Sequence, residues 1–141
     1  MQTIRTLILE DDIETLSVLL KGLRGLEENL ESSTPPQNLA LTILSECTQV
    51  EEYINKCDKD RFDIILLDRD CKSGGSFHTL DIEKIGAEKI IGISGMPNYN
   101  EELKKRGVTK IIDKTLDDLE TFTQKVIPLI TRTLKETGKI K

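Results

Sequence analysis

Five short apolar segments, separated by polar and helix-like stretches, constrain the fold of this 141-residue chain more than any other feature. They span residues 4–9, 39–44, 62–67, 89–93 and 108–112. Between them, apolar residues recur at spacings of three and four, which is the period of an amphipathic helix. Strands joined through helices run parallel, with right-handed crossovers and helices on both faces of the sheet. The sequence therefore predicts an α/β fold, a doubly wound five-stranded parallel sheet of (βα)5 type.

The same patterns place the helices. We expect them at residues 13–26, 50–57, 80–85, 100–106 and 116–134. Asp12 is placed to cap the first helix, and Gly107 to end the fourth. A polar loop is expected at residues 31–36. In the last helix, Pro128 removes a backbone hydrogen bond, so we expect a kink or a break there.

Length and composition limit the kind of protein. A chain of this length fits one domain, which we place at residues 1–136, with residues 137–141 as a C-terminal tail or linker. The formal net charge is −5, from 20 basic and 25 acidic residues, which argues against nucleic-acid binding. No apolar run approaches the ~20 residues of a membrane span. Three cysteines without a CxxC pair are typical of a reduced, cytoplasmic protein.

Chemically active side chains follow four of the five predicted strands. Because the carboxyl ends of parallel strands meet at one edge of the sheet, we expect these side chains to gather there. Carboxylates ~5 Å apart repel by about 3 kcal/mol per pair at an effective dielectric of ~20, so such a cluster has to hold a proton, bind a cation or contact a lysine. The residues are Glu10, Asp11, Asp68, Asp70, Ser94 and Lys114.

These residue types together favour phosphoryl transfer. Ligation by oxygen atoms alone suits a hard cation such as Mg²⁺. Asp68 is a candidate nucleophile that would form an acyl phosphate. The hydroxyl of Ser94 and the ammonium of Lys114 would contact phosphoryl oxygens.

At these positions the sequence resembles the response-regulator receiver domain of two-component signalling. The order of an acidic pair, an acceptor aspartate, a Ser or Thr and a lysine is specific to that family, and the resemblance covers nearly the whole chain. It implies a flavodoxin-like fold and a signalling domain rather than an enzyme, with only slow self-catalysed phosphoryl transfer and dephosphorylation. The matching segments are residues 6–12, 63–68, 91–95 and 111–114.

The resemblance also implies ligands and partners. Asp68 would accept a phosphoryl group from a partner histidine kinase or phosphotransfer protein. Mg²⁺ would be held by Glu10, Asp11 and Asp68, with the backbone carbonyl of Asp70 as a further ligand. The face formed by the fourth helix, the fifth strand and the last helix would bind an output protein, which the sequence does not identify, or a second copy of the chain.

Among the departures from the usual pattern of that family, two concern single residues next to the predicted site. Ser94 and the residue on the fifth strand, here Ile111, would act as the switch, but the latter is usually aromatic. The lysine is usually followed by a proline, and here Thr115 follows Lys114. The chain is thus similar to a divergent receiver whose main site positions are filled.

Two other functions remain open. A haloacid-dehalogenase-type phosphatase also has a strand followed by Asp-x-Asp, with Asp68 as nucleophile and Asp70 as acid/base. Against it, two strands precede this motif, and residues 117–118 stand at a helix start rather than a strand end. The third alternative is a receiver-like interaction module that is never phosphorylated.

Overall fold

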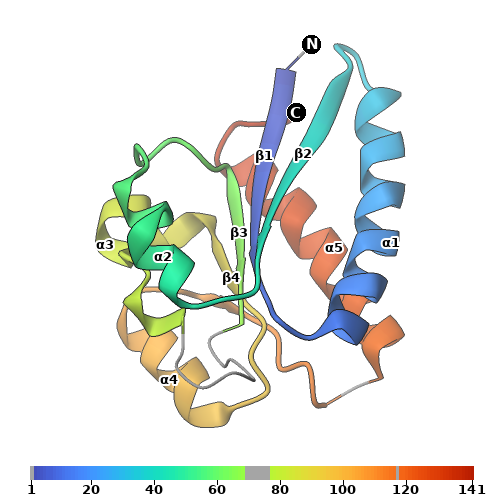
Figure 1. The fold of residues 1–141 in the computed structure, drawn as a ribbon. Coiled ribbons are helices and arrows are strands. Elements are labelled where there is room, and N and C mark those ends of the chain that lie inside the picture. The colour runs from blue at the N-terminus through green and yellow to red at the C-terminus, as the bar shows by residue number, and fades with distance from the viewer. Residues whose placement is uncertain (1, 69–76, 117) are drawn as a thin grey trace.

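A single parallel sheet organises the computed structural model, which describes residues 2–68, 77–116 and 118–141 (Figure 1). The strand order is β2-β1-β3-β4-β5, and every neighbouring pair is parallel. The predicted doubly wound α/β fold is therefore confirmed. The strands are β1 Gln2–Leu9, β2 Gln37–Leu44, β3 Ile64–Leu67, β4 Ile90–Gly92 and β5 Lys110–Ile111.

Helices cover both faces of this sheet. In Figure 1, α1 and α5 lie on one side, and α2, α3 and α4 lie on the other. Short 3₁₀ turns occupy Ile54–Lys56, Phe77–Thr79 and Ala87–Lys89. The helices are α1 Ile13–Glu31, α2 Thr48–Glu52, α3 Ile82–Ile85, α4 Pro97–Lys105 and α5 Leu119–Glu136.

The core has two halves, one on each face of β3. Ile64 and Leu66 pack among residues of α1 and α5, whereas Ile65 and Leu67 pack against the α2–α4 side. All four side chains are buried, as expected of a central strand covered on both faces.

Several helix ends differ from the predicted ones. The first helix continues to Glu31 because Leu30 is buried and extends the apolar face by one turn. The fourth begins at Pro97 instead of residue 100, since proline suits the first turn of a helix. It ends before Gly107, as predicted, where a φ of 95° favours glycine.

The predicted break at Pro128 is wrong. The helix α5 runs without interruption from Leu119 to Glu136 with Pro128 inside it. Val126 and Ile130, on either side of the proline, are both fully buried. Packing of both halves against the sheet therefore compensates for the missing backbone hydrogen bond.

The C-terminal residues lie against the amino-terminal edge of the sheet. The amide of Gln37 donates to the carbonyl of Lys139 at 2.9 Å, and Ile140 packs against the core between α1 and α5. Among the described residues, no helix combines the length and the apolar composition that crossing a membrane requires.

Candidate functional site

Three of the predicted site residues meet at the carboxyl edge of the sheet. The Nζ atom of Lys114 lies 2.8 Å from Oε1 of Glu10 and 2.5 Å from Oδ2 of Asp68. Because Leu9 pairs with Leu67, the residues that follow them, Glu10 and Asp68, leave adjacent strands side by side. The lysine follows β5, which is two strands away from β3, and its long side chain spans that distance.

This trio is buried and electrostatically coupled. Glu10 is fully buried and Asp68 is 2% exposed, while the side chain of Lys114 is 19% exposed. Burial, together with the hydrogen bond and the charge of Asp68, raises the pKa of Glu10 to about 8, against the opposing effect of Lys114. Burial lowers the pKa of Lys114, but its bonds to Asp68 and Glu10 outweigh burial, and the net shift is upward. The repulsion between the carboxylates is thus relieved by a proton and a lysine.

A surface depression of ≈ 340 Å³ opens above the trio. Asp68 and Lys114 lie in its wall, and Asp11 stands half-buried beside them. Asp12 also lines it and caps α1 as predicted, with its carboxylate accepting from the backbone N–H of Thr15 at 3.0 Å. The acceptor candidate is therefore buried but faces a space that reaches solvent.

The remaining predicted residues occupy different surroundings. Ser94 is fully buried, and its hydroxyl accepts from the backbone N–H of Met96 at the start of α4, at 3.1 Å. Ile111 is partly buried and packs against the core on the α2–α4 side. Asp70 lies outside the described residues.

Sequence reasoning missed two hydrogen bonds in the turn after β5. One carboxylate oxygen of Asp113 accepts from both the backbone N–H and the hydroxyl of Thr115, at 2.8 and 2.6 Å. Asp side chains commonly hydrogen-bond to the backbone two residues further on, so the aspartate at position 113 carried part of this signal. Among the described residues, Thr34–Pro35 is the single cis peptide bond, so the bond between Lys114 and Thr115 is trans.

The two carboxylates of the trio fit a metal ion by their chemistry. Within the described residues, no group of three or more His, Cys, Asp or Glu side chains is gathered around one point. Two buried carboxylates, those of Glu10 and Asp68, nevertheless share one cation, the ammonium of Lys114. Carboxylate oxygens are the donors that Mg²⁺ prefers, so these residues suit a hard cation.

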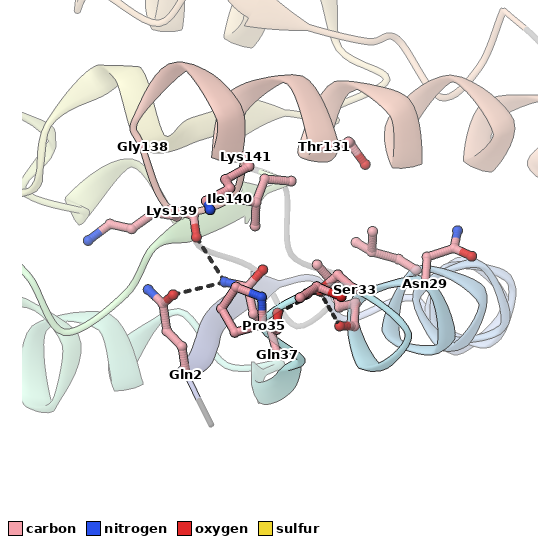
Figure 2. Close-up of a pocket in the computed structure, with 13 residues that line it drawn as sticks. Gln2, Asn29, Ser33, Pro35, Gln37, Thr131, Gly138, Lys139, Ile140 and Lys141 are labelled. Carbon is pink, nitrogen blue, oxygen red and sulfur yellow. Dashed lines mark hydrogen bonds between the residues drawn. The ribbon is translucent and has the colours of Figure 1, made fainter.

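A second cavity, of ≈ 380 Å³, lies at the amino-terminal edge of the sheet (Figure 2). Its lining includes amide and hydroxyl side chains of Asn29, Ser33 and Gln37 and the C-terminal residues 138–141. Gln37 donates there to the side-chain oxygen of Gln2 and to the carbonyl of Lys139. In the part of the chain that the structure describes, no acidic side chain lines this cavity, so no Asp or Glu is placed there for acyl-phosphate chemistry.

The structure also bears on the phosphatase alternative. Strands β1 and β2 precede β3, so the Asp-x-Asp segment does not open the domain. Asp118 caps α5, accepting from the backbone N–H of Thr121 at 2.7 Å, and this hydrogen bond lowers the pKa of Asp118. Asp118 thus has a structural role at a helix start and does not follow a strand.

Comparison with known proteins supports the fold. No family model matches the sequence, and no curated protein matches it. The structure is similar to the crystal structure of a response regulator from Hahella chejuensis, with a TM-score of 0.58 and 11% sequence identity. The likeness covers 93% of this chain and 95% of that one. The chain therefore has the flavodoxin-like α/β fold of that response regulator.

Proposed function

We propose that this chain is a cytoplasmic receiver-type signalling domain that accepts a phosphoryl group on Asp68 from a phosphohistidine of a partner kinase or phosphotransfer protein. One observation carries the proposal. Lys114 contacts two buried carboxylates, Glu10 and Asp68, at the edge of the sheet where a parallel α/β fold binds its ligands. A stable core does not require two buried carboxylates in contact, whereas phosphoryl transfer uses a nucleophile next to a fixed positive charge.

On the side of this chain, the nucleophile and the lysine of the transfer step are already adjacent. A carboxylate oxygen of Asp68 attacks phosphorus, the new P–O bond forms, and the P–N bond of the phosphohistidine breaks. The histidine nitrogen leaves with the electron pair of that bond. Lys114, hydrogen-bonded to Asp68 beforehand, remains beside the incoming phosphoryl oxygens and pairs with their charge. Ser94, whose hydroxyl accepts from the N–H of Met96, would donate its O–H to another phosphoryl oxygen.

Mg²⁺ is part of this proposal. Glu10, Asp11 and Asp68 would hold it, together with the backbone carbonyl of Asp70. When bound, it would neutralise charge on the phosphoryl group. Glu10, whose pKa is raised to about 8, would release its proton when it becomes a ligand.

The output surface follows from the elements next to the site. The added charge of about −1.5 to −2 on Asp68 would shift the loops after β4 and β5. Exposed apolar side chains occupy both loops, since Met96 is 44% exposed and Leu116 is 78% exposed. We propose that the surface from α4 through β5 to α5 binds an output protein or a second copy of the chain.

The test is intact mass after incubation with acetyl phosphate and Mg²⁺. We expect a gain of one phosphoryl group that requires the metal and is lost in Asp68→Asn. The matched control is Asp63→Asn, at the other end of β3, which should gain the group like the natural chain. Rapid release of phosphate without a mass gain would instead support the phosphatase. Neither gain nor release, also with phosphohistidine donors, would support the unphosphorylated module.

A further inference from the structure

The turn that carries Lys114 is held by its own side chains. Asp113 precedes the lysine and Thr115 follows it, and one oxygen of Asp113 accepts two hydrogen bonds from Thr115. The first uses the backbone N–H of Thr115, a group that a proline would lack. The second uses its hydroxyl, so both ends of the turn are fixed relative to Lys114.

The same turn packs against the loop after β4. A Cβ atom added to Gly95 would overlap the γ-methyl of Thr115, because the two carbon atoms would lie far closer than van der Waals contact. The methyl group therefore lies directly over the glycine backbone. Gly95 follows Ser94, so this contact joins the loops after β4 and β5 at the edge of the depression.

If residue 95 carried a Cβ atom, Thr115 could rotate its methyl group away only by losing a hydrogen bond. Its Cβ carries the hydroxyl bound to Asp113 and the methyl over Gly95, and staggered rotamers exchange these groups. Moving the methyl away would also move the hydroxyl out of its 2.6 Å hydrogen bond. Position 95 thus accommodates only glycine as long as residue 115 carries the methyl group in this rotamer.

We propose that Asp113 and Thr115, packed on Gly95, are positioning residues that hold Lys114 in contact with Asp68. The inference rests on the proposed function for its consequence, because a displaced lysine would slow phosphoryl acceptance by Asp68. The contact itself is independent of that function. The hydrogen bonds from Thr115 to Asp113 supply the fixed backbone geometry after the lysine.

A pair of compensating substitutions tests the packing. Gly95→Ala should displace the turn, and Thr115→Ser should leave it in place, because serine keeps the hydroxyl and lacks the methyl. In the double variant Gly95→Ala/Thr115→Ser, the methyl added at position 95 occupies the space that the threonine methyl has left. We expect Gly95→Ala to slow acceptance by ~10-fold or more and the double variant to restore it to within about twofold.

A second pair tests the hydrogen bonds. Asp113→Asn keeps an oxygen that accepts from Thr115, whereas Asp113→Ala removes it. We expect the alanine variant to resemble Gly95→Ala and the asparagine variant to resemble the natural chain. Thermal unfolding of every variant checks that the fold is retained, since global loss of stability would not be reversed by deleting a methyl group.

A readout without phosphorylation separates the two proposals. Trace acetylation with acetic anhydride, mapped by mass spectrometry, reports how accessible Lys114 is relative to Lys104, whose side chain is 56% exposed. Protection of Lys114 should fall in Gly95→Ala and in Asp113→Ala and return in the double variant. If no variant is phosphorylated but protection follows this pattern, the proposed function fails and the positioning role stands. If Lys114 stays equally protected in all variants, or the double variant is not rescued, the positioning role is wrong.

Discussion

Strand β3 has an aspartate at each end, and the two carboxylates have opposite surroundings. The backbone N–H groups of Asp63 and Asp68 both donate to carbonyls of β1, at 2.7 and 2.9 Å. The carboxylate of Asp63 accepts from the backbone N–H of Arg5 at 2.8 Å and faces the ammonium of Lys139 at 3.3 Å. Each oxygen of Asp63 therefore contacts a donor. These two contacts account for the burial of its carboxylate.

Asp68 is buried against another acid. Glu10 hydrogen-bonds with it and Lys114 contacts both, so stability at this end depends on one proton and one lysine. The same strand thus shows a carboxylate that supports strand pairing and one whose burial opposes folding unless it is compensated. Such a conflict with local stability is typical of functional sites, and it favours the carboxyl edge over the cavity of Figure 2 as the candidate site.

The largest expected effect on stability comes from removing the shared lysine. Lys114→Met keeps much of the side-chain volume and removes the ammonium, which leaves Glu10 and Asp68 buried in contact without a cation. We expect a loss of about 3–5 kcal/mol in the free energy of unfolding at pH 8. The loss should be smaller at pH 5, well below the raised pKa of Glu10, because that carboxyl then holds a proton. Urea unfolding measures both.

The control for this lysine is Lys104→Met. That residue forms an exposed ion pair with Glu101, so its loss should change stability by less than ~0.5 kcal/mol. If Lys114→Met were as stable as the natural chain at pH 8, the two buried carboxylates would not destabilise the folded state in the absence of the lysine, and this interpretation would be wrong.

A smaller effect is expected from pH alone. The pKa of Glu10 is raised from 4.5 to about 8, so between these values the folded state holds a proton that the unfolded state has released. The free energy of unfolding should therefore fall by a few kcal/mol as the pH rises from about 4.5 to 8. Outside that range the titration of Glu10 should change it little. Urea unfolding in EDTA measures the slope.

Glu10→Gln provides the comparison for the pH effect. Glutamine cannot ionise, so the variant should lack this part of the slope and gain most in relative stability at high pH. If the natural chain and the variant showed the same dependence of unfolding free energy on pH, the titration of buried Glu10 would not be the cause of the slope. Mg²⁺ should also flatten the slope of the natural chain, because a bound cation replaces the proton.

The fold was largely predictable because its signals are strong and redundant. The apolar residues of β3 and the stripe of α5 are buried as their periods indicate. Exact ends were harder, since they depend on pairing. The strand predicted at residues 108–112 is reduced to Lys110–Ile111, because its hydrogen bonds depend on the short neighbouring strand β4.

Within the site, the residues that directly follow a strand were easier to place from the sequence than the contacts between loops. Glu10 and Asp68 directly follow paired strands, so the sheet register places them side by side. Their proximity could therefore be predicted from the sequence. The bond of Ser94 to the start of α4 and the contact between Thr115 and Gly95 depend on loop conformations. These loops are separated along the chain, and no periodicity records how they meet.

The smallest effects are expected at the other end of β3. Asp63→Ala leaves the N–H of Arg5 without its acceptor at a partly buried position, and we expect a loss of about 1–3 kcal/mol in urea unfolding. Lys139→Ala should cost less than ~1 kcal/mol, because its ammonium is over a third exposed and screened by solvent. Both variants should accept a phosphoryl group on Asp68 as fast as the natural chain does, as measured by intact mass over time. If Asp63→Ala lost acceptance while it remained folded, the two ends of the strand would be coupled, and the structural role assigned to Asp63 would be wrong.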